Sequence, residues 1–238
     1  VQSDDSVRSG HAYLPMHWGD RFLKGRGTNV LTTAVFDPLS KQPELKHASV
    51  EVSKIDLPWQ LFALVEGDVQ NRLSALRPLC EDFAYASLGL TGRERPALLI
   101  RAAASSAPDN ALLAQIDQLL GLDAGPIMAY DDPRKAIGKR VRIEHGRITA
   151  LRLAGETAAR DWLKSLWREG RADEELRRWL LAPLSTPPGN SGASTAGKTL
   201  CSCINVSQEA ICAGISRGLD LNGLKQELGC GSQCGSCV

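Results

Sequence analysis

The sequence predicts an α+β protein built from three folded parts. Three observations support this prediction: strand-like runs and turn residues fill residues 1–56, helical and strand patterns mix over residues 57–182, and most of the seven cysteines lie in the last forty residues. A chain of 238 residues is long enough for two or three domains. We therefore expect a β-rich first part, an α+β middle domain and a small helical domain at the end.

Residues 1–56 are predicted to belong to a β-rich domain. The runs HAYLPMHW and ASVEVS alternate with loops rich in Gly, Asn, Asp and Pro. Short runs of this kind bounded by turn residues are typical of strands.

Residues 57–182 are predicted to form the α+β middle domain. In DNALLAQIDQLLG the apolar residues recur at helical spacing, with Asp109 or Asn110 as N-cap and Gly121 just past the end. In KRVRIEHGRITALRLAG the apolar residues alternate on both sides of His145-Gly146. This alternation predicts a β-hairpin that turns at these two residues.

Two helices are expected to close the middle domain. They cover ETAARDWLKSLWREG and ADEELRRWLLAPL, are separated at Gly170, and the second starts at Asp173. Trp162, Leu166 and Trp167 stand at helical spacing, which favours a core stripe over an aromatic shelf for a cofactor. Residues 183–198 are rich in Pro, Gly, Ser and Thr and are predicted to be a linker.

Residues 199–238 are predicted to form a small metal-binding domain. A Cys-x-Cys pair, Cys201 and Cys203, stands at its start, and a Cys-x-x-Cys pair, Cys234 and Cys237, stands near its end. Two short helices are expected between the pairs, and folding one back on the other would bring the four thiols together. So small a domain buries little apolar surface and usually needs a metal or a disulfide.

The first of these two helices is expected to start at the N-cap Ser207 and to end at Gly218, with Val206 and Ile211 packed across its first turn. The second is expected at about 221–228.

The ligand chemistry leaves two metals open. Four thiolates suit tetrahedral zinc and equally suit an iron–sulfur cluster. The Cys-x-Cys arm and the nearby Gly229, Gly231 and Gly235, which allow backbone N–H groups to approach inorganic sulfide, favour [2Fe-2S]. We interpret Cys80 and Cys212, which stand among apolar neighbours, as buried structural thiols.

Charge and hydropathy bear on location and partners. Lys and Arg total 28 against 27 Asp and Glu, with no basic block, so neither nucleic acid nor an anionic membrane is an expected partner. No apolar run approaches the roughly 18 residues of a membrane span, and the start VQSDDSVRSG lacks the features of a signal peptide. We expect a soluble, cytoplasmic protein.

The C-terminal pattern resembles a known family. Cys-x-Cys, an Asn-Val-Ser helix start, about thirty residues and then Gly-Cys-Gly-x-x-Cys-Gly-x-Cys are similar to the [2Fe-2S] domain of the bacterioferritin-associated ferredoxin type. The resemblance covers residues 199–238 and implies that Cys201, Cys203, Cys234 and Cys237 are the cluster ligands. It leaves Cys230 as a spare thiol.

The N-terminal segment resembles a second family. The order Asn-x-Leu-Thr, Asp-Pro-x-Ser-Lys and Glu-Leu-Lys is similar to the end of the molybdopterin dinucleotide-binding domain of the molybdenum oxidoreductases. The resemblance implies part of a β-barrel in residues 1–56. It also implies that Asn29 hydrogen-bonds the cofactor, that Lys46 faces its charged or pterin part, and that His17 and Trp18 lie on the loop nearest the pterin.

Together the two resemblances imply the C-terminal part of the large catalytic subunit of bacterial assimilatory nitrate reductase. This family reduces nitrate to nitrite at molybdenum, held by a bis(molybdopterin guanine dinucleotide) cofactor. Electrons come through iron–sulfur centres from a reduced flavoprotein, an NAD(P)H-linked subunit or a ferredoxin.

The molybdenum ligand and the N-terminal [4Fe-4S] motif of the family are missing here. We therefore expect a piece of a larger enzyme or a separate reading frame, inactive alone, with no catalytic residue of its own. The alternatives are a stand-alone [2Fe-2S] electron-transfer protein and a zinc-stabilised interaction module.

Overall fold

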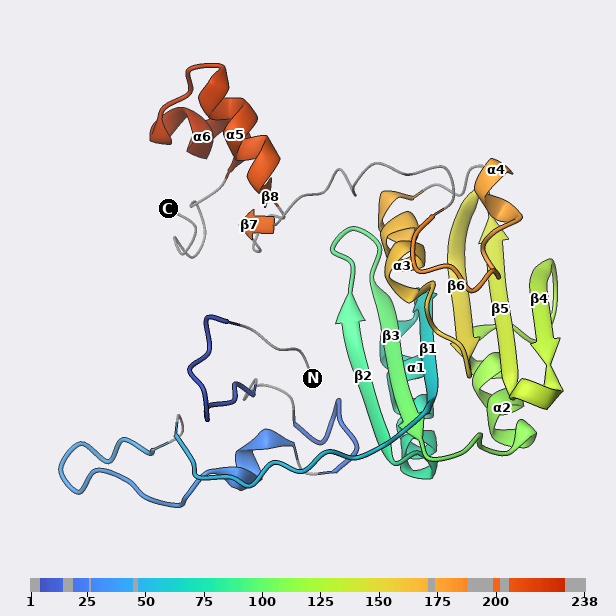
Figure 1. Cartoon of the computed structure of the whole chain (residues 1–238), viewed down its shortest axis with the longest axis horizontal. Helices are drawn as coiled ribbons and strands as arrows, with labels where there is room; N and C mark the ends of the chain where they lie inside the picture. The colour runs from blue at the N-terminus through green and yellow to red at the C-terminus, as the bar shows by residue number, and fades with distance from the viewer. Residues whose placement is uncertain are drawn as a thin grey trace. The chain divides into compact units, whose positions relative to one another are not determined.

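The chain divides into two compact units, Val1–Pro187 and Pro188–Val238. The computed structural model describes residues 5–14, 19–25, 27–44, 47–170, 174–187, 199–201 and 206–229 (Figure 1). Over these residues, the first unit has a six-stranded antiparallel sheet with helices on both faces, and the second has two helices and a two-stranded sheet. The prediction of an α+β protein is confirmed.

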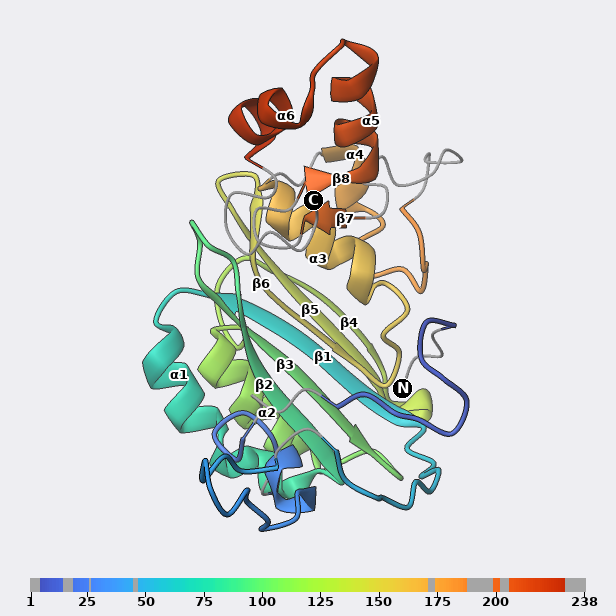
Figure 2. The same cartoon turned by 90° about the vertical axis from the view of Figure 1, so that its left-hand side faces the viewer.

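The sheet of the first unit has the strand order β2-β3-β1-β6-β5-β4 (Figure 2). Every neighbouring pair in it is antiparallel. Its strands are β1 (Trp59–Glu66), β2 (Tyr85–Thr91), β3 (Ala97–Ala104), β4 (Ile127–Asp132), β5 (Ile137–Glu144) and β6 (Arg147–Ala154). The helices of this unit are η1 (Thr28–Leu31), α1 (Val69–Leu76), η2 (Pro78–Asp82), α2 (Asn110–Leu120), η3 (Pro133–Lys135), α3 (Arg160–Glu169) and α4 (Glu174–Arg177).

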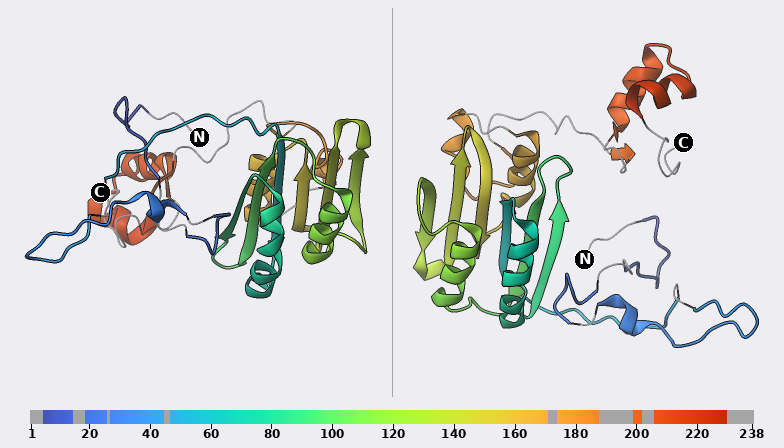
Figure 3. Two further views of the ribbon diagram at one scale, coloured as in Figure 1. Left: turned by 90° about the horizontal axis from the view of Figure 1, so that it is seen from below. Right: turned by 180° about the vertical axis from the view of Figure 1, so that it is seen from behind.

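Helices cover both faces of this sheet, as the views from below and from behind also show (Figure 3). Leu61 and Val65 of β1 pack with α1 and α2, whereas Phe62 and Leu64 pack with α3. Successive side chains of a strand point to opposite faces, so a central strand with helices on both sides is apolar throughout. This explains why WQLFALVE lacks the alternation of a half-exposed strand.

Several local predictions for this unit are confirmed. The Asp109 carboxylate accepts a hydrogen bond from the Ala111 amide at 3.1 Å and caps α2, which ends at the left-handed Gly121. His145 and Gly146, with φ of 51° and 73°, form the turn between β5 and β6. Trp162, Leu166 and Trp167 of α3 are buried in the core, as the helical spacing predicted.

Two predictions for this unit differ from the structure. The second closing helix is short: α4 ends at Arg177, and residues 178–182 form turns. The described residues before β1 hold a 3-10 helix and isolated bridges but no strand, so the expected part of a β-barrel is not formed there. The run at 48–53 has no neighbouring strand to pair with, and an unpaired strand is not stable in water.

A segment upstream of the sheet nevertheless pairs with its edge. Leu23 bridges to Ser87 of β2, the Lys24 amide donates to the Ala86 carbonyl at 2.9 Å, and the Leu88 amide donates to the Phe22 carbonyl at 2.6 Å. The Lys24 ammonium also donates to the Glu81 and Phe83 carbonyls, at 2.8 and 2.5 Å. Residues 22–24 thus bond two backbone groups on the outer edge of β2, the Ala86 carbonyl and the Leu88 amide.

The second unit is built from β7 (Thr199–Cys201), β8 (Val206–Ser207), α5 (Gln208–Ser216) and α6 (Leu221–Leu228). Both predicted helices are confirmed, with Ser207 as the N-cap of α5, accepting from the Ala210 amide at 3.2 Å. The helices pack closely at Gly214, where a Cβ would lie 2.6 Å from a methyl carbon of Leu224. A side chain at this position would require Leu224 to shift.

None of the helices in the described ranges is long and apolar enough to cross a membrane.

Candidate functional site

The structure describes some of the predicted site residues and not others. His17, Trp18, Lys46, Cys203, Cys234 and Cys237 lie outside the described residues. Asn29 lies inside them, and so does the backbone of Cys201. The described part of the candidate site comprises the loop that carries Asn29 and the two helices that follow Cys201.

Asn29 lies in the 3-10 turn η1 and is exposed. Its carbonyl accepts from the Thr32 amide at 3.3 Å and from the Thr32 hydroxyl at 2.8 Å, which closes the turn. Gly27, the residue just before η1, has a φ of 73°. An amide side chain on a tight exposed turn has both a donor and an acceptor to offer to a polar ligand.

The following loop, Asp37 to Lys41, is closed by its own polar groups. The Asp37 carboxylate accepts from the Leu39 and Ser40 amides at 3.0 and 2.6 Å, and the Ser40 hydrogen bonds hold its pKa below the usual range. The Lys41 amide donates to the Asp37 carbonyl, and the Lys41 ammonium stands 5.5 Å from the centroid of the Phe36 ring. Asp37 and Pro38 thus begin a turn.

Apolar side chains in this first part of the chain are open to solvent. The most exposed is Leu39 at the tip of the loop, at 92%. Others, between 47% and 80% exposed, are Tyr13, Leu14, Val30, Leu31, Val35, Phe36, Val52 and Ile55. Segments with this many exposed apolar residues are found where a protein meets another surface.

The second unit holds the backbone of Cys201 next to the start of α5. Cys201 pairs with Val206 across β7 and β8. Ser207, the residue after Val206, is the N-cap of α5. Among its described residues, only Val206 and Leu224 are buried apolar side chains. Two such side chains contribute about 3 to 6 kcal/mol, so the core in the described part of this unit is small. A metal or covalent staple is the usual remedy.

Of the three other thiols, Cys230 lies outside the described residues, and Cys80 and Cys212 differ in exposure. Cys80 is buried beside α1, and burial raises the pKa of its thiol to about 11, as expected of a structural cysteine. Cys212 is exposed on α5, so the expectation that it is buried is wrong. Its side chain lies away from the face on which Gly214 meets Leu224. Within the described ranges, no three His, Cys, Asp or Glu side chains gather as a metal site.

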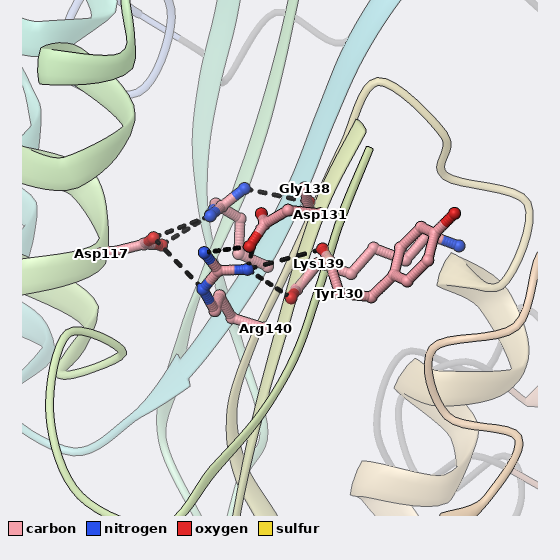
Figure 4. A network of polar contacts seen from close by, with 7 residues as sticks. Asp117, Tyr130, Asp131, Gly138, Lys139 and Arg140 are labelled. Atoms are coloured by element: carbon pink, nitrogen blue, oxygen red, sulfur yellow. Dashed lines mark hydrogen bonds and ion pairs between the residues drawn. The ribbon is translucent and has the colours of Figure 1, made fainter. Parts of the chain in front are cut away.

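Sequence reasoning missed a buried polar network in the first unit (Figure 4). The Arg152 guanidinium donates to both carboxylate oxygens of Asp117, at 2.5 and 2.7 Å, and to the Gly138 carbonyl at 3.0 Å. Arg140 pairs with Asp131 at 2.9 Å, and its Nε lies 4.0 Å from Asp117. Because each charge here meets its partner, we interpret the network as structural rather than catalytic.

Lys139, on the opposite face of β5, is 1% exposed. Its ammonium pairs with Glu156 and donates to the Leu181 carbonyl at 3.0 Å. This contact fixes the segment after α4 against the sheet.

Comparison with known proteins relates the first part of the chain to a family of cofactor-binding domains. Residues 1–49 match the family described as "Molydopterin dinucleotide binding domain". The whole chain is 27% identical, over 244 aligned residues, to a nitrate reductase of Klebsiella oxytoca, of which the match covers 25%. A stretch of 50 residues, 21% of the chain, is 38% identical to a nitrate reductase of Synechocystis and covers 7% of that protein. No solved structure matches significantly.

The comparisons confirm part of the sequence analysis. Residues 1–49 resemble the molybdopterin dinucleotide binding family, and the chain as a whole is similar to a nitrate reductase. It spans about a quarter of the length of the Klebsiella relative. The iron–sulfur cluster and the individual site residues stay predictions.

Proposed function

We propose that this chain is part of a molybdenum-dependent nitrate reductase that serves nitrate assimilation. Its N-terminal segment would contribute contacts to a molybdopterin guanine dinucleotide, and its C-terminal unit would carry a [2Fe-2S] electron relay. The observation that carries the proposal is the similarity along the whole chain to a nitrate reductase, joined to a match of residues 1–49 with the dinucleotide-binding family.

The chemistry of the first segment is compatible with this cofactor. A dinucleotide offers pyrophosphate oxygens and a guanine edge, which are bound by backbone amides in irregular loops and by amide side chains. Asn29 presents such a side chain on an exposed turn, and the backbone around it is irregular. Asn29 and Lys46 are the proposed contacts, with His17 and Trp18 nearest the pterin.

The relay is proposed for Cys201, Cys203, Cys234 and Cys237. Two facts support it: the spacing of the four cysteines, and an apolar core of two buried side chains in the described part of the unit. A bound cluster would supply one-electron transfer, while the protein residues hold it and join the two helices. Nitrate, an electron donor and the part of the enzyme that holds the molybdenum ligand and a [4Fe-4S] cluster are the proposed partners.

The relay is tested on the chain purified without air, by metal and sulfide analysis, visible absorption and EPR. We expect two irons and two sulfides per chain and an EPR signal after reduction. The signal should be lost in Cys203→Ser and Cys234→Ser but kept in Cys212→Ser, a matched control because Cys212 is an exposed thiol of the same unit. Colourless protein with one zinc would refute the relay and favour a zinc-stabilised module.

The cofactor contact is tested separately. Molybdopterin guanine dinucleotide released from another molybdoenzyme is mixed with the chain, and bound pterin is measured by the fluorescence of its oxidised form. We expect Asn29→Ala to weaken retention and Asn71→Ala, a surface amide on α1 that bonds Asp68, to leave it unchanged. Retention unaffected by Asn29→Ala would contradict the assigned role. Iron in a chain that binds no pterin would favour a stand-alone electron-transfer protein.

A further inference from the structure

One corner of the first unit gathers positive charge on the face of the sheet that α3 covers. Lys164 and Arg168 stand one helical turn apart on α3, beside the buried stripe of Trp162, Leu163 and Trp167. The i and i+4 positions of a helix share one side, so both side chains flank the same edge of the stripe. Lys164 is half-buried and Arg168 is exposed.

Arg101 belongs to the same corner. In the sheet it lies opposite Phe62 of β1 and Ser87 of β2. Phe62 packs in the core beneath α3, so Arg101 points to the α3 side as well. Its side chain is exposed. The pKa of Lys164 is lowered, mainly by burial and then by the positive charges of Arg101 and Arg168. Asp161 acts in the opposite direction and raises it.

No carboxylate pairs with these three cations within the part of the chain that the structure describes. Two other cations of the unit do meet acidic partners: Arg95 pairs with Glu66 at 2.8 Å, and Arg152 pairs with Asp117 at 2.5 Å. Asp161, the acidic residue nearest in sequence to Lys164, is 81% exposed and lies 3.6 Å from Arg160. Like charges brought together without an anion raise the free energy of the folded protein.

On the adjoining part of the sheet, Tyr85 is exposed and the small side chains of Ser87 and Ala103 are half-buried. Tyr85 and Ser87 of β2 stand on the same face as Arg101 and Ala103 of β3. Tyr85 is 45% exposed, whereas Leu88, on the opposite face of β2, is 2% exposed. α3 lies in front of the sheet, and β2 is the strand at one edge of the sheet (Figure 1).

We propose that Tyr85, Arg101, Lys164 and Arg168, here named the cationic face, form a docking surface for a protein with an acidic surface. Complementary charge steers such partners and selects among them. Tyrosine and arginine are the residue types enriched at the energetic centres of protein interfaces. The chain as a whole has 28 cations against 27 anions, which does not favour nucleic acid.

A protein suits this surface better than a small anion does. Small ligands bind in concave sites that enclose most of their area. The cationic face combines strand residues of a sheet with one flank of a helix, and none of its residues lines the open pocket formed by Asp82, Asp109, Leu112 and their neighbours. The proposal is independent of the cluster and of the pterin.

A fluorescently labelled peptide of ten glutamates is the probe, titrated with the full chain at low ionic strength and followed by anisotropy. The matched variants are Arg101→Gln with Lys164→Gln, and Arg134→Gln with Lys135→Gln, which remove the same charge from the exposed turn η3. We expect the first pair to weaken binding about tenfold and the second less than about twofold. Raising the salt concentration should abolish binding in each case.

Equal weakening by both pairs, or no binding of the peptide to the unmodified chain, would overturn the proposal. Hydrogen exchange on the unmodified chain gives a second test that needs no variant to fold. Added peptide should slow exchange at β2, β3 and the second half of α3, and leave β4 unchanged. Protection centred on η3 would refute the assignment.

Discussion

Replacing Asp117 with Asn leaves the Arg152 guanidinium buried without its carboxylate. The two side chains are 10% and 3% exposed and are joined by two short hydrogen bonds. Removing one partner of a buried ion pair costs about 3 to 5 kcal/mol, because an uncompensated charge stays in the interior. Asn keeps the shape and one acceptor oxygen, so we expect a loss of about 3 kcal/mol, or roughly 10 °C in melting temperature.

The assay is urea unfolding followed by tryptophan fluorescence, since Trp59, Trp162 and Trp167 are buried in this unit. The control is Asp131→Asn, which removes a carboxylate bonded to Arg140 at 2.9 Å but is 52% exposed. Exposed pairs contribute about 0 to 1 kcal/mol.

Equal effects of the Asp117 and Asp131 substitutions would refute the reasoning. A double variant, Asp117→Leu with Arg152→Met, removes both charges and should recover most of the loss. Stability no better than that of Asp117→Asn would mean that packing, rather than the unpaired charge, sets the cost.

Three further predictions concern single residues. Gly155→Ala should lower the free energy of unfolding by about 2 to 4 kcal/mol, because φ is +79° and a Cβ would lie 2.3 Å from the Ala136 carbonyl oxygen. Gly67→Ala, at φ +70° with nothing within 4 Å, should lower it by about 1 to 2 kcal/mol. Iodoacetamide at pH 8 should modify Cys212 and spare Cys80 in native protein, as peptide mass mapping would reveal. Ser207→Ala should lower the stability of the second unit by about 1 kcal/mol in thermal unfolding.

The raised pKa of Cys80 also has a consequence for pH. The thiol has a pKa of 9.0 when unfolded and about 11 when folded, so the folded state holds its proton more tightly. The stabilisation is complete below pH 9 and is lost as the pH rises through 11. Urea midpoints between pH 8 and 11 should fall less steeply in Cys80→Ala than in the unmodified chain.

Each of these predictions has an outcome that would contradict it. Equal costs for the two glycine substitutions would mean that the Ala136 carbonyl gives way to the new methyl group. Rapid labelling of Cys80 in native protein would indicate that α1 opens readily. No effect of Ser207→Ala, judged against Ser216→Ala at the other end of α5, would mean that the cap contributes nothing there.

Local structure followed well from sequence wherever neighbouring residues determine it. The caps of α2, the hairpin at His145-Gly146 and the buried stripe of α3 each depend on residues a few positions apart, and each is confirmed. The burial of Lys139 and Arg152 could not be read in the same way. Their partners lie 17 and 35 residues away, on other elements, and periodicity carries no information about such pairs.

The candidate site shows the same limit. Spacing was enough to propose four cysteine ligands and two helices between them, and the helices are where they were expected. The strands expected before residue 57 depend on partners outside their own sequence, and no local pattern indicates whether these are present. The exposure of Cys212 likewise depends on which side of α5 meets α6, which its apolar neighbours in sequence did not reveal.

The pairing of residues 22–24 with β2 affects how the chain can be divided. Composition would place a boundary near residue 57, but a protein that started there would leave the Ala86 carbonyl and the Leu88 amide of β2 without these partners. An open strand edge is a template for pairing between molecules, so this shorter protein should self-associate and aggregate. A protein that starts before Gly19 keeps this part of the edge paired and should aggregate less at the same concentration.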